Sequence, residues 1–227
     1  MGILADGGAI LAGGLLGSLL GSRIKQNNMQ FLALVIMIIS LPEAAACLLA
    51  FENGKITTHY ILPVVACLFF GACLGDALKL SERVKKLEQS GRSRSMQAFC
   101  LGCLFFGIGG LQMTAPIAWA LRGDSGQLLL KTAVDFPFAL AFGAMYGRGV
   151  CASGVVVLAL QLAIGGVAYA FSGFFSDALI TQLCAVGYIL LFFMGFNLMQ
   201  NNPKIDTLNM LPSLLLLCML HVLRQIW

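Results

Sequence analysis

A lysine and an aspartate stand four residues apart inside an apolar stretch of this chain. Lys131 and Asp135 belong to the segment at about residues 125–146, which is otherwise mostly apolar. Residues four apart are neighbours on one face of a helix, so the two side chains would meet. Charged groups are costly in hydrocarbon, and those that occur there usually face a bundle interior or a watery cavity. The pair is therefore the first candidate for a functional site.

The pair admits two interpretations. In the first, Lys131 and Asp135 form a neutralising ion pair, or the lysine reaches the outer interface while Asp135 hydrogen-bonds a neighbouring helix. In the second, Asp135 binds a cation or carries a proton, and Lys131 supplies a competing positive charge. The second interpretation predicts an ion site near the middle of the membrane.

Amide side chains in other apolar segments could extend a polar path from this pair, because interior amides need partners and offer both donors and acceptors. They are Gln112, Gln161, Asn197 and Asn209. Each amide also suits hydrogen bonding between helices. Asp124, with Ser125, suits the N-cap of the helix that carries the pair. The predicted ion- or substrate-binding residues are Asp135, Lys131, Gln112, Asn209, Asn197 and Asp124.

Composition indicates the class of protein that surrounds these residues. The chain has 227 residues, of which 59% are hydrophobic and 11% charged, and its mean hydropathy is +0.90. These values exclude an ordinary soluble domain. The net charge of +4 is small and spread over short connections, so nucleic-acid binding has no support. We predict an all-α, polytopic transmembrane helical bundle that forms a single integral membrane domain over residues 1–227.

The apolar runs predict seven to eight membrane spans, and eight is the preferred number. Most runs have roughly the 20 residues that a helix needs to cross a bilayer, but the last is short. The runs lie at about residues 3–22, 29–51, 60–80, 96–121, 125–146, 150–171, 178–199 and 208–223. The first contains Asp6 and a Gly-rich run and has no basic region before it, so we expect a retained helix rather than a signal peptide.

Two features interrupt these runs. The fourth contains several glycines, Gln112 and Pro116, a composition typical of a broken helix that exposes backbone groups for binding. In the second, Glu43 follows Pro42. The glutamate brings a potential charge into an apolar background, or it lies in the interface near the outer end of its helix.

Glycines recur at a spacing of four residues. Gly13, Gly17 and Gly21 place small residues on one helix face, which favours close packing against another helix, and a glycine strip lining a narrow pathway is the alternative. The same Gly-x-x-x-Gly pattern occurs at 71–75 and 143–147. This similarity suggests internal repeats, from which transporters and channels are often built.

Basic residues predict the orientation. They gather after odd-numbered spans, above all in the segment 79–95, and the positive-inside rule places that basic amphipathic segment in the cytoplasm with both chain termini outside. The residues after odd-numbered spans are Arg23, Lys25, Lys79, Arg83, Lys85, Lys86, Arg92, Arg94, Arg148 and Lys204.

Enzymatic chemistry has little support in the sequence. All eight cysteines lie within or beside apolar runs, where cysteine behaves as a small hydrophobe. Cys100-x-x-Cys103 is the only pair with redox spacing, and no metal-spaced histidines or nucleotide-binding loop accompany it. We therefore predict neither an enzyme nor a cofactor, while the role of the pair stays open.

The residues around the charged pair also carry a resemblance. The stretch Gly123-Asp124-x-x-x-Leu128-x-x-Lys131-Thr132-x-x-Asp135-Phe136 resembles the central signature of the YqgA/YdfK-like bacterial inner-membrane proteins, a family of unknown function. The Gly13-Gly14-x-x-Gly17 run and the stretches 185–198 and 209–212 agree with it, so the resemblance spans nearly the whole chain. It implies a bacterial inner-membrane protein and no particular activity.

The chain departs from that family pattern at two places. Gln112 is followed by Met113, where the family tends to have an acidic residue and a glycine, and Asp6 stands where the family often has asparagine. These differences suggest that this member differs in substrate or mechanism.

Two functions fit these observations. The first is a small secondary transporter or channel for an ion or small polar solute. The second is a non-transporting membrane protein whose 79–95 segment docks a cytosolic partner or anionic lipid. The many faces of small residues also favour a homodimer.

Overall fold

The computed structural model describes residues 2–20, 26–52, 55–89, 94–107, 110–200 and 205–226, and nearly all of them are helical. The longer helices coincide with the apolar runs, since a helix satisfies every backbone hydrogen bond within itself, as hydrocarbon requires. They are α1 (Gly2–Leu20), α2 (Gln26–Leu48), α3 (Ile61–Ala77), α4 (Leu80–Gln89), α5 (Arg94–Gly107), α6 (Gly110–Arg122), α7 (Gly126–Tyr146), α8 (Gly149–Ala170), α9 (Asp177–Met199) and α10 (Pro212–Ile226). Short 3-10 helices occupy Ser172–Phe174 and Thr207–Met210 (η3).

In the described part of the chain, six helices are long and apolar enough to cross a membrane, and α5 with α6 makes a seventh if the bent pair counts as one span. They are α1, the part Gln30–Leu48 of α2, α7, α8, α9 and the segment Thr207–Arg224. With a rise of about 1.5 Å per residue, such helices match a hydrocarbon layer of about 30 Å. This composition indicates a multi-pass membrane protein. The apolar helix α3 has only 17 residues.

The interruption expected in the fourth apolar run is present. Ser95–Gly107 and Gly110–Arg122 meet at an angle of 54°, on either side of a short gap in the described residues that contains Gly109. Gln112 therefore lies in the first turn after the break. By contrast, α2, α6 and α7 each continue through an internal proline.

The second run ends earlier than its apolar residues suggested. The helix stops at Leu48, and Ala50–Glu52 (β1) pairs antiparallel with Lys55–Thr57 (β2), so Phe51 belongs to a short hairpin instead of the helix. The sequence between the two strands is Asn53-Gly54, a dipeptide that strongly favours hairpins.

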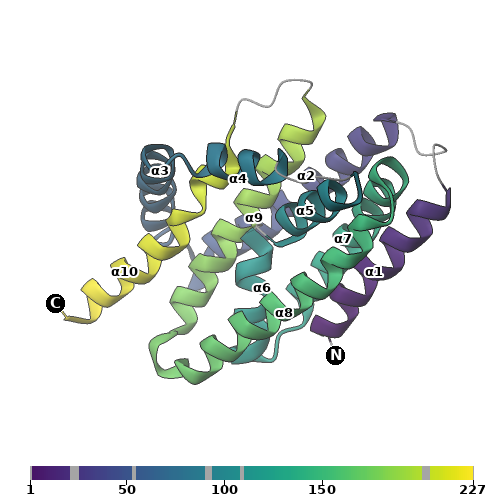
Figure 1. Cartoon of the computed structure of the whole chain (residues 1–227). Coiled ribbons are helices and arrows are strands. Elements are labelled where there is room, and N and C mark those ends of the chain that lie inside the picture. The colour runs from purple at the N-terminus through teal and green to yellow at the C-terminus, as the bar shows by residue number, and fades with distance from the viewer. Residues whose placement is uncertain are drawn as a thin grey trace.

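The helices pack in pairs that are distant in sequence (Figure 1). The most extensive contact joins α1 to α7, and the next joins α2 to α9, which lies in the middle of the bundle. Beside this main body, α10 packs against α3. The N-terminus therefore lies next to the helix that carries Lys131 and Asp135.

Glycines bring α1 and α7 together. A Cβ on Gly17 would lie 2.0 Å from the carbonyl oxygen of Leu140, and one on Gly13 would lie 2.6 Å from that of Phe136. Only glycine allows backbones to approach this closely. The close packing predicted for this glycine strip is confirmed at these two positions, and Gly21 lies outside the described residues.

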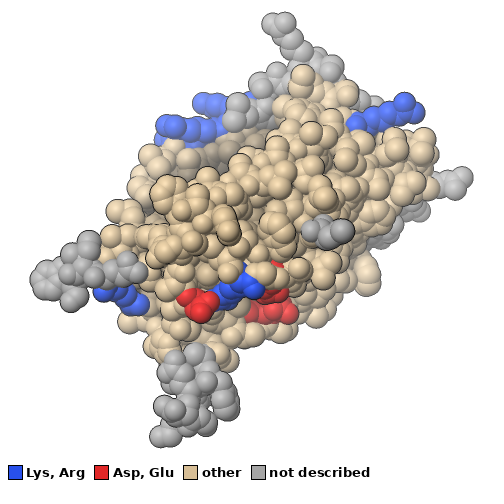
Figure 2. Space-filling model, turned by 90° about the horizontal axis from the view of Figure 1, so that it is seen from below, with Lys and Arg blue, Asp and Glu red and all other residues tan. Residues whose placement is uncertain are grey.

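Most of the surface seen in Figure 2 carries no Lys, Arg, Asp or Glu side chain. Large hydrophobic side chains such as Leu62, Phe31 and Tyr169 are more than half exposed, as expected for helices that face lipid. The 79–95 segment contains the predicted amphipathic helix, which is α4. Lys79, just before this helix, and Arg83 and Lys86 within it are exposed. Arg23, Lys25, Arg92 and Lys204 lie outside the described residues.

Candidate functional site

Lys131 and Asp135 meet inside the bundle. They lie on successive turns of α7, and the Lys131 ammonium donates to Oδ2 of Asp135. Lys131 is 4% exposed and Asp135 is 6% exposed. The lysine is therefore buried in the bundle. It does not extend to the outer interface, as one of the alternatives above required.

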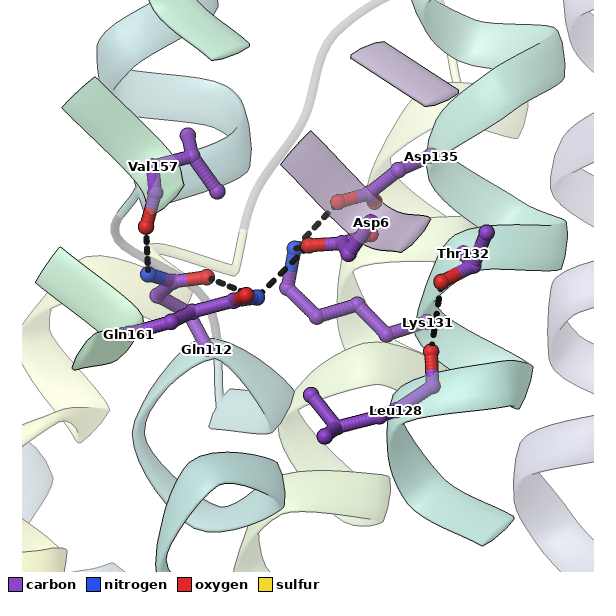
Figure 3. A network of polar contacts seen from close by, with 8 residues as sticks. All are labelled: Asp6, Gln112, Leu128, Lys131, Thr132, Asp135, Val157 and Gln161. Carbon is purple, nitrogen blue, oxygen red and sulfur yellow. Dashed lines mark hydrogen bonds and ion pairs between the residues drawn. The ribbon is translucent and has the colours of Figure 1, made fainter. Parts of the chain in front are cut away.

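A second carboxylate completes the group. Asp6 of α1 is fully buried, and its Oδ2 lies 2.8 Å from Lys131 Nζ. It reaches the lysine because the small residues of α1 allow that helix to lie directly against α7. One ammonium thus holds two carboxylates that are 129 positions apart in the chain and that come from two helices (Figure 3).

Two glutamines continue the network. Gln161 of α8 donates from Nε2 to Asp6 Oδ2 at 2.6 Å, and the same nitrogen lies 3.2 Å from Gln112 Oε1. Gln112 in turn donates to the carbonyl oxygen of Val157 at 3.4 Å. Both glutamines are fully buried. The network therefore links α1, α6, α7 and α8 through side chains alone (Figure 3).

The network carries uncompensated charge and unused acceptors. With all three charged groups ionised, two carboxylates face one ammonium, which leaves a net charge of −1. Asp6 Oδ1 and Gln161 Oε1 are buried and have no hydrogen-bond partner. Buried polar atoms without partners are uncommon in native proteins and call for an explanation such as a bound ion.

A small cavity of about 30 Å³ adjoins the network, lined in part by Gln112, Lys131 and Asp135. On one side of it, Phe105 and Phe106 continue into an aromatic cluster with Phe138, Phe142 and Tyr146. The space is comparable to that of one water molecule. It could hold a small ion or water beside Asp135, and it is too small for an organic solute.

The two asparagines predicted for the site lie apart from the network at Lys131. Asn209 in η3 accepts from the backbone N–H of Ser81 at 2.9 Å, and its Nδ2 lies 3.5 Å from Asp76 Oδ1, so it joins η3 to α3 and α4. Asn197 donates to the carbonyl oxygen of Ile205 and links α9 to the segment before η3, while its Oδ1 is buried without a partner. Neither amide has a hydrogen bond to the network at Lys131, so the structure does not bring Asn209 together with Asp135.

Asp124 also lies apart from Lys131. It is exposed at the beginning of α7, where its Oδ1 accepts from the N–H of Gly126 at 2.8 Å. The N-cap residue itself is Ser125, whose side chain makes no capping bond. The local cap is therefore supplied by the aspartate. Asp124 lines a separate, larger cavity with Glu43 and Gln127.

Sequence reasoning did not place Asp6 in the site. The signal was present, because Asp6 is an acidic residue inside an apolar helix and the argument made for Asp135 applies to it equally. Its partner lies on a helix 125 residues away, and no spacing rule connects them. Gln161, considered only as a member of a polar path, does join the network.

Cysteine and metal chemistry find no centre in the described part of the chain. All eight cysteines are free thiols, and Cys100 and Cys103 are half-buried. Among the described residues, no group of three or more His, Cys, Asp or Glu side chains could hold a metal ion.

Comparisons with known proteins agree with the resemblance read from the signature around Asp135. The "Uncharacterized protein YqgA" of Escherichia coli (strain K12) is 22% identical over 234 aligned residues, which cover 100% of this chain and 98% of that protein. No solved structure matches the chain. A family model described as "Protein of unknown function (DUF554)" matches residues 1–222. The chain therefore belongs to the DUF554 family.

Proposed function

We propose that this protein is a small secondary transporter or channel of the bacterial inner membrane, and that its buried network binds a proton or a small monovalent cation. The observation that carries the proposal is the surplus of acceptors around Lys131. Two buried carboxylates share one ammonium, and Asp6 Oδ1 lacks a partner. Charged residues inside membrane helices are rare, and they mark substrate and ion pathways.

In this mechanism Lys131 is a resident counter-ion. When no substrate is bound, its ammonium neutralises one of the two carboxylates of Asp6 and Asp135 and contacts both. An arriving cation or proton supplies the second positive charge and leaves the group neutral. The electrostatic attraction of the Lys131 ammonium to the two carboxylates is then weaker, and this weakens the link between α1 and α7. The change in contact between these helices would couple binding to movement.

The bend between α5 and α6 supports the same function. Gly110 and Gln112 follow the break, and both line the small cavity beside Lys131 and Asp135. Broken helices in transporters expose backbone groups near the substrate site. Gly110, the first described residue after the break, lines the cavity beside the network.

We infer eight spans for this transporter. The six long helices and the bent α5–α6 pair account for seven, and the shorter α3 would be the eighth. The positive-inside rule then places α4 in the cytoplasm and both chain termini outside. The glycine-rich ends of the odd-numbered spans would descend from internal repeats. The protein would have no enzymatic activity and need no cofactor, and it would act as a homodimer through its exposed apolar faces.

A flux assay tests transport. Purified full-length protein would be placed in liposomes, gradients of protons, Na⁺ or K⁺ would be imposed, and ion movement would be followed with a dye inside the vesicles. We expect protein-dependent movement of at least one of these cations. Asp135→Asn should slow it by about tenfold or more, because losing an ion contact worth about 1.4 kcal/mol costs tenfold in binding.

Glu82→Gln is the matched control, since Glu82 is an exposed acid on α4 outside the network. It should leave the flux unchanged. Asp6→Asn gives a second measurement should Asp135→Asn not fold. The proposal fails if the folded wild-type protein moves none of the three cations, or if both aspartate variants retain full flux.

A second candidate function rests on α4. Lys79, Arg83 and Lys86 are exposed on or beside this amphipathic helix, which suits docking to anionic lipid or to an acidic partner. Reversing charge with Arg83→Glu and Lys86→Glu should then abolish the cellular phenotype. Under the transport proposal, the same double variant keeps its flux in liposomes.

A further inference from the structure

A second polar cavity, of about 250 Å³, lies at the end of the bundle where α7 begins. Four helices contribute to it, namely α2, α6, α7 and α9. Glu43 and Asp124 are exposed, whereas Gln127, Cys184 and Tyr188 are buried. The cavity therefore has an accessible acidic rim and a buried floor.

The floor contains an acceptor without a donor. Gln127 is 5% exposed and lines the cavity, and its Oε1 has no hydrogen-bond partner. A buried amide oxygen of this kind needs a donor or a cation. Tyr188 lines the same cavity, and its hydroxyl can donate a hydrogen bond as well as accept one.

The charges at the rim favour a cation. Glu43 and Asp124 contribute two negative charges, and the basic residue among the lining side chains is Arg122. Arg122 is engaged by its own partners, because it contacts Asp177 Oδ1 at 3.0 Å, the Asp177 carbonyl oxygen and the Thr181 hydroxyl. Figure 2 looks onto this end of the bundle, where acidic atoms lie on both sides of a basic side chain.

The cavity lies one helical turn from the buried network. On α7, Gln127 is one turn before Lys131, so the two side chains point to the same side of the helix. On α9, Tyr188 lines the large cavity and Leu191, less than one turn further on, lines the small cavity beside Asp135. The two cavities thus occupy successive turns of the same two helices.

We propose that the cavity between Glu43, Asp124 and Gln127 is the entrance through which a small hydrated cation reaches the network at Lys131. The acidic rim concentrates cations, and the Gln127 amide oxygen replaces part of their hydration on the way inward. This entrance rests on the proposed transport function. It assigns a role to Glu43 and Gln127, which lie outside the buried network.

Cys47 provides a reporter in the wild-type chain, because it lines the cavity and is half-buried. The purified full-length protein would be treated with a cationic and with an anionic methanethiosulfonate reagent of similar size, and labelling at Cys47 would be followed by peptide mass spectrometry. We expect the cationic reagent to react about tenfold faster, since an acidic cleft raises the local concentration of cations by tenfold or more.

Glu43→Gln with Asp124→Asn should bring the two labelling rates close together, whereas Glu82→Gln on α4 should leave their ratio unchanged. Na⁺ or K⁺ should also slow labelling by the cationic reagent more than N-methylglucamine does at equal ionic strength. Equal rates with the two reagents in the wild type, no labelling of Cys47, or no effect of the rim variants would overturn the entrance.

These outcomes are separable from those of the flux assay. Charge-selective labelling without flux leaves the cavity as a cation site and removes the transport proposal. Flux without charge-selective labelling keeps transport and places the entrance elsewhere.

Discussion

Lys131 holds two carboxylates together, so the network should respond unequally to the loss of its members. Lys131→Met leaves Asp6 and Asp135 buried without a counter-ion, and removing one partner of a buried ion pair costs about 3–5 kcal/mol. Asp6→Asn or Asp135→Asn leaves one carboxylate with one ammonium, so each should cost less. Thermal unfolding of the purified protein in detergent would rank the variants.

The triple variant Lys131→Met, Asp6→Asn, Asp135→Asn is the control for that ranking. It removes every charge from the network and should recover much of the stability that Lys131→Met loses, because neutral side chains can replace a buried ion group at little cost. Equal losses for all three single variants would show that the charges do not interact as the contacts indicate.

At this scale the sequence predicted the contact between Lys131 and Asp135 because it depends on helical spacing within one segment. The contacts of Lys131 with Asp6, and of Asp6 with Gln161, depend on which helices pack together, and no local rule supplies that. Asn209 is also a polar residue in an apolar segment, but its hydrogen bonds join η3 to α3 and α4 instead of the network, and no local rule separates these two uses of an amide.

Among the elements, the contact between α1 and α7 positions Asp6 and depends on glycine. Gly17→Ala would place a Cβ 2.0 Å from the Leu140 carbonyl oxygen, and a backbone atom cannot move aside without separating the helices. Overpacking of this kind typically costs about 1–3 kcal/mol. Thermal unfolding should show a clear loss of stability, with a loss of flux as Asp6 moves away from Lys131.

Gly8→Ala on the same helix is the matched control, since a Cβ there would meet nothing within 4 Å. It should leave both stability and flux close to wild type. If the two substitutions behave alike, the tight α1–α7 contact does not exist in the membrane.

The helices themselves could be predicted because apolar runs of sufficient length have one stable form in hydrocarbon. The break after Gly107 could be predicted from the glycines of the fourth run, whereas Pro116, the other signal, lies inside the continuous helix α6. The hairpin after α2 was missed because Phe51 and its neighbours extend an apolar run, and apolarity alone does not separate a helix end from a short strand.

For the whole molecule, the number of spans depends on α3. A reporter inserted between residues 52 and 55 precedes α3, and one inserted between residues 89 and 94 follows α4. If α3 crosses the membrane, the first reporter lies outside and the second in the cytoplasm. Activity of reporters that work on only one side of the membrane would check this. If both reporters lie on the same side, α3 does not cross the membrane and the protein has seven spans.

At this scale composition was sufficient for the class of protein, because 59% hydrophobic residues leave few soluble alternatives. The pairing of helices was not predictable, since lipid-facing and helix-facing sides of an apolar segment have similar hydrophobicity. The low helical amphipathicity of α1 and α9 illustrates this, because apolar residues lie all around both helices.

The most direct test of cation binding at Asp6, Lys131 and Asp135 is the charge displaced when proteoliposomes on a solid-supported membrane meet a step in proton, Na⁺ or K⁺ concentration. If these residues bind a cation, at least one of the three cations should give a protein-dependent current that is unchanged in Glu82→Gln and lost in Asp135→Asn. No current with any of the three, or an undiminished current in a folded Asp135→Asn protein, would contradict it.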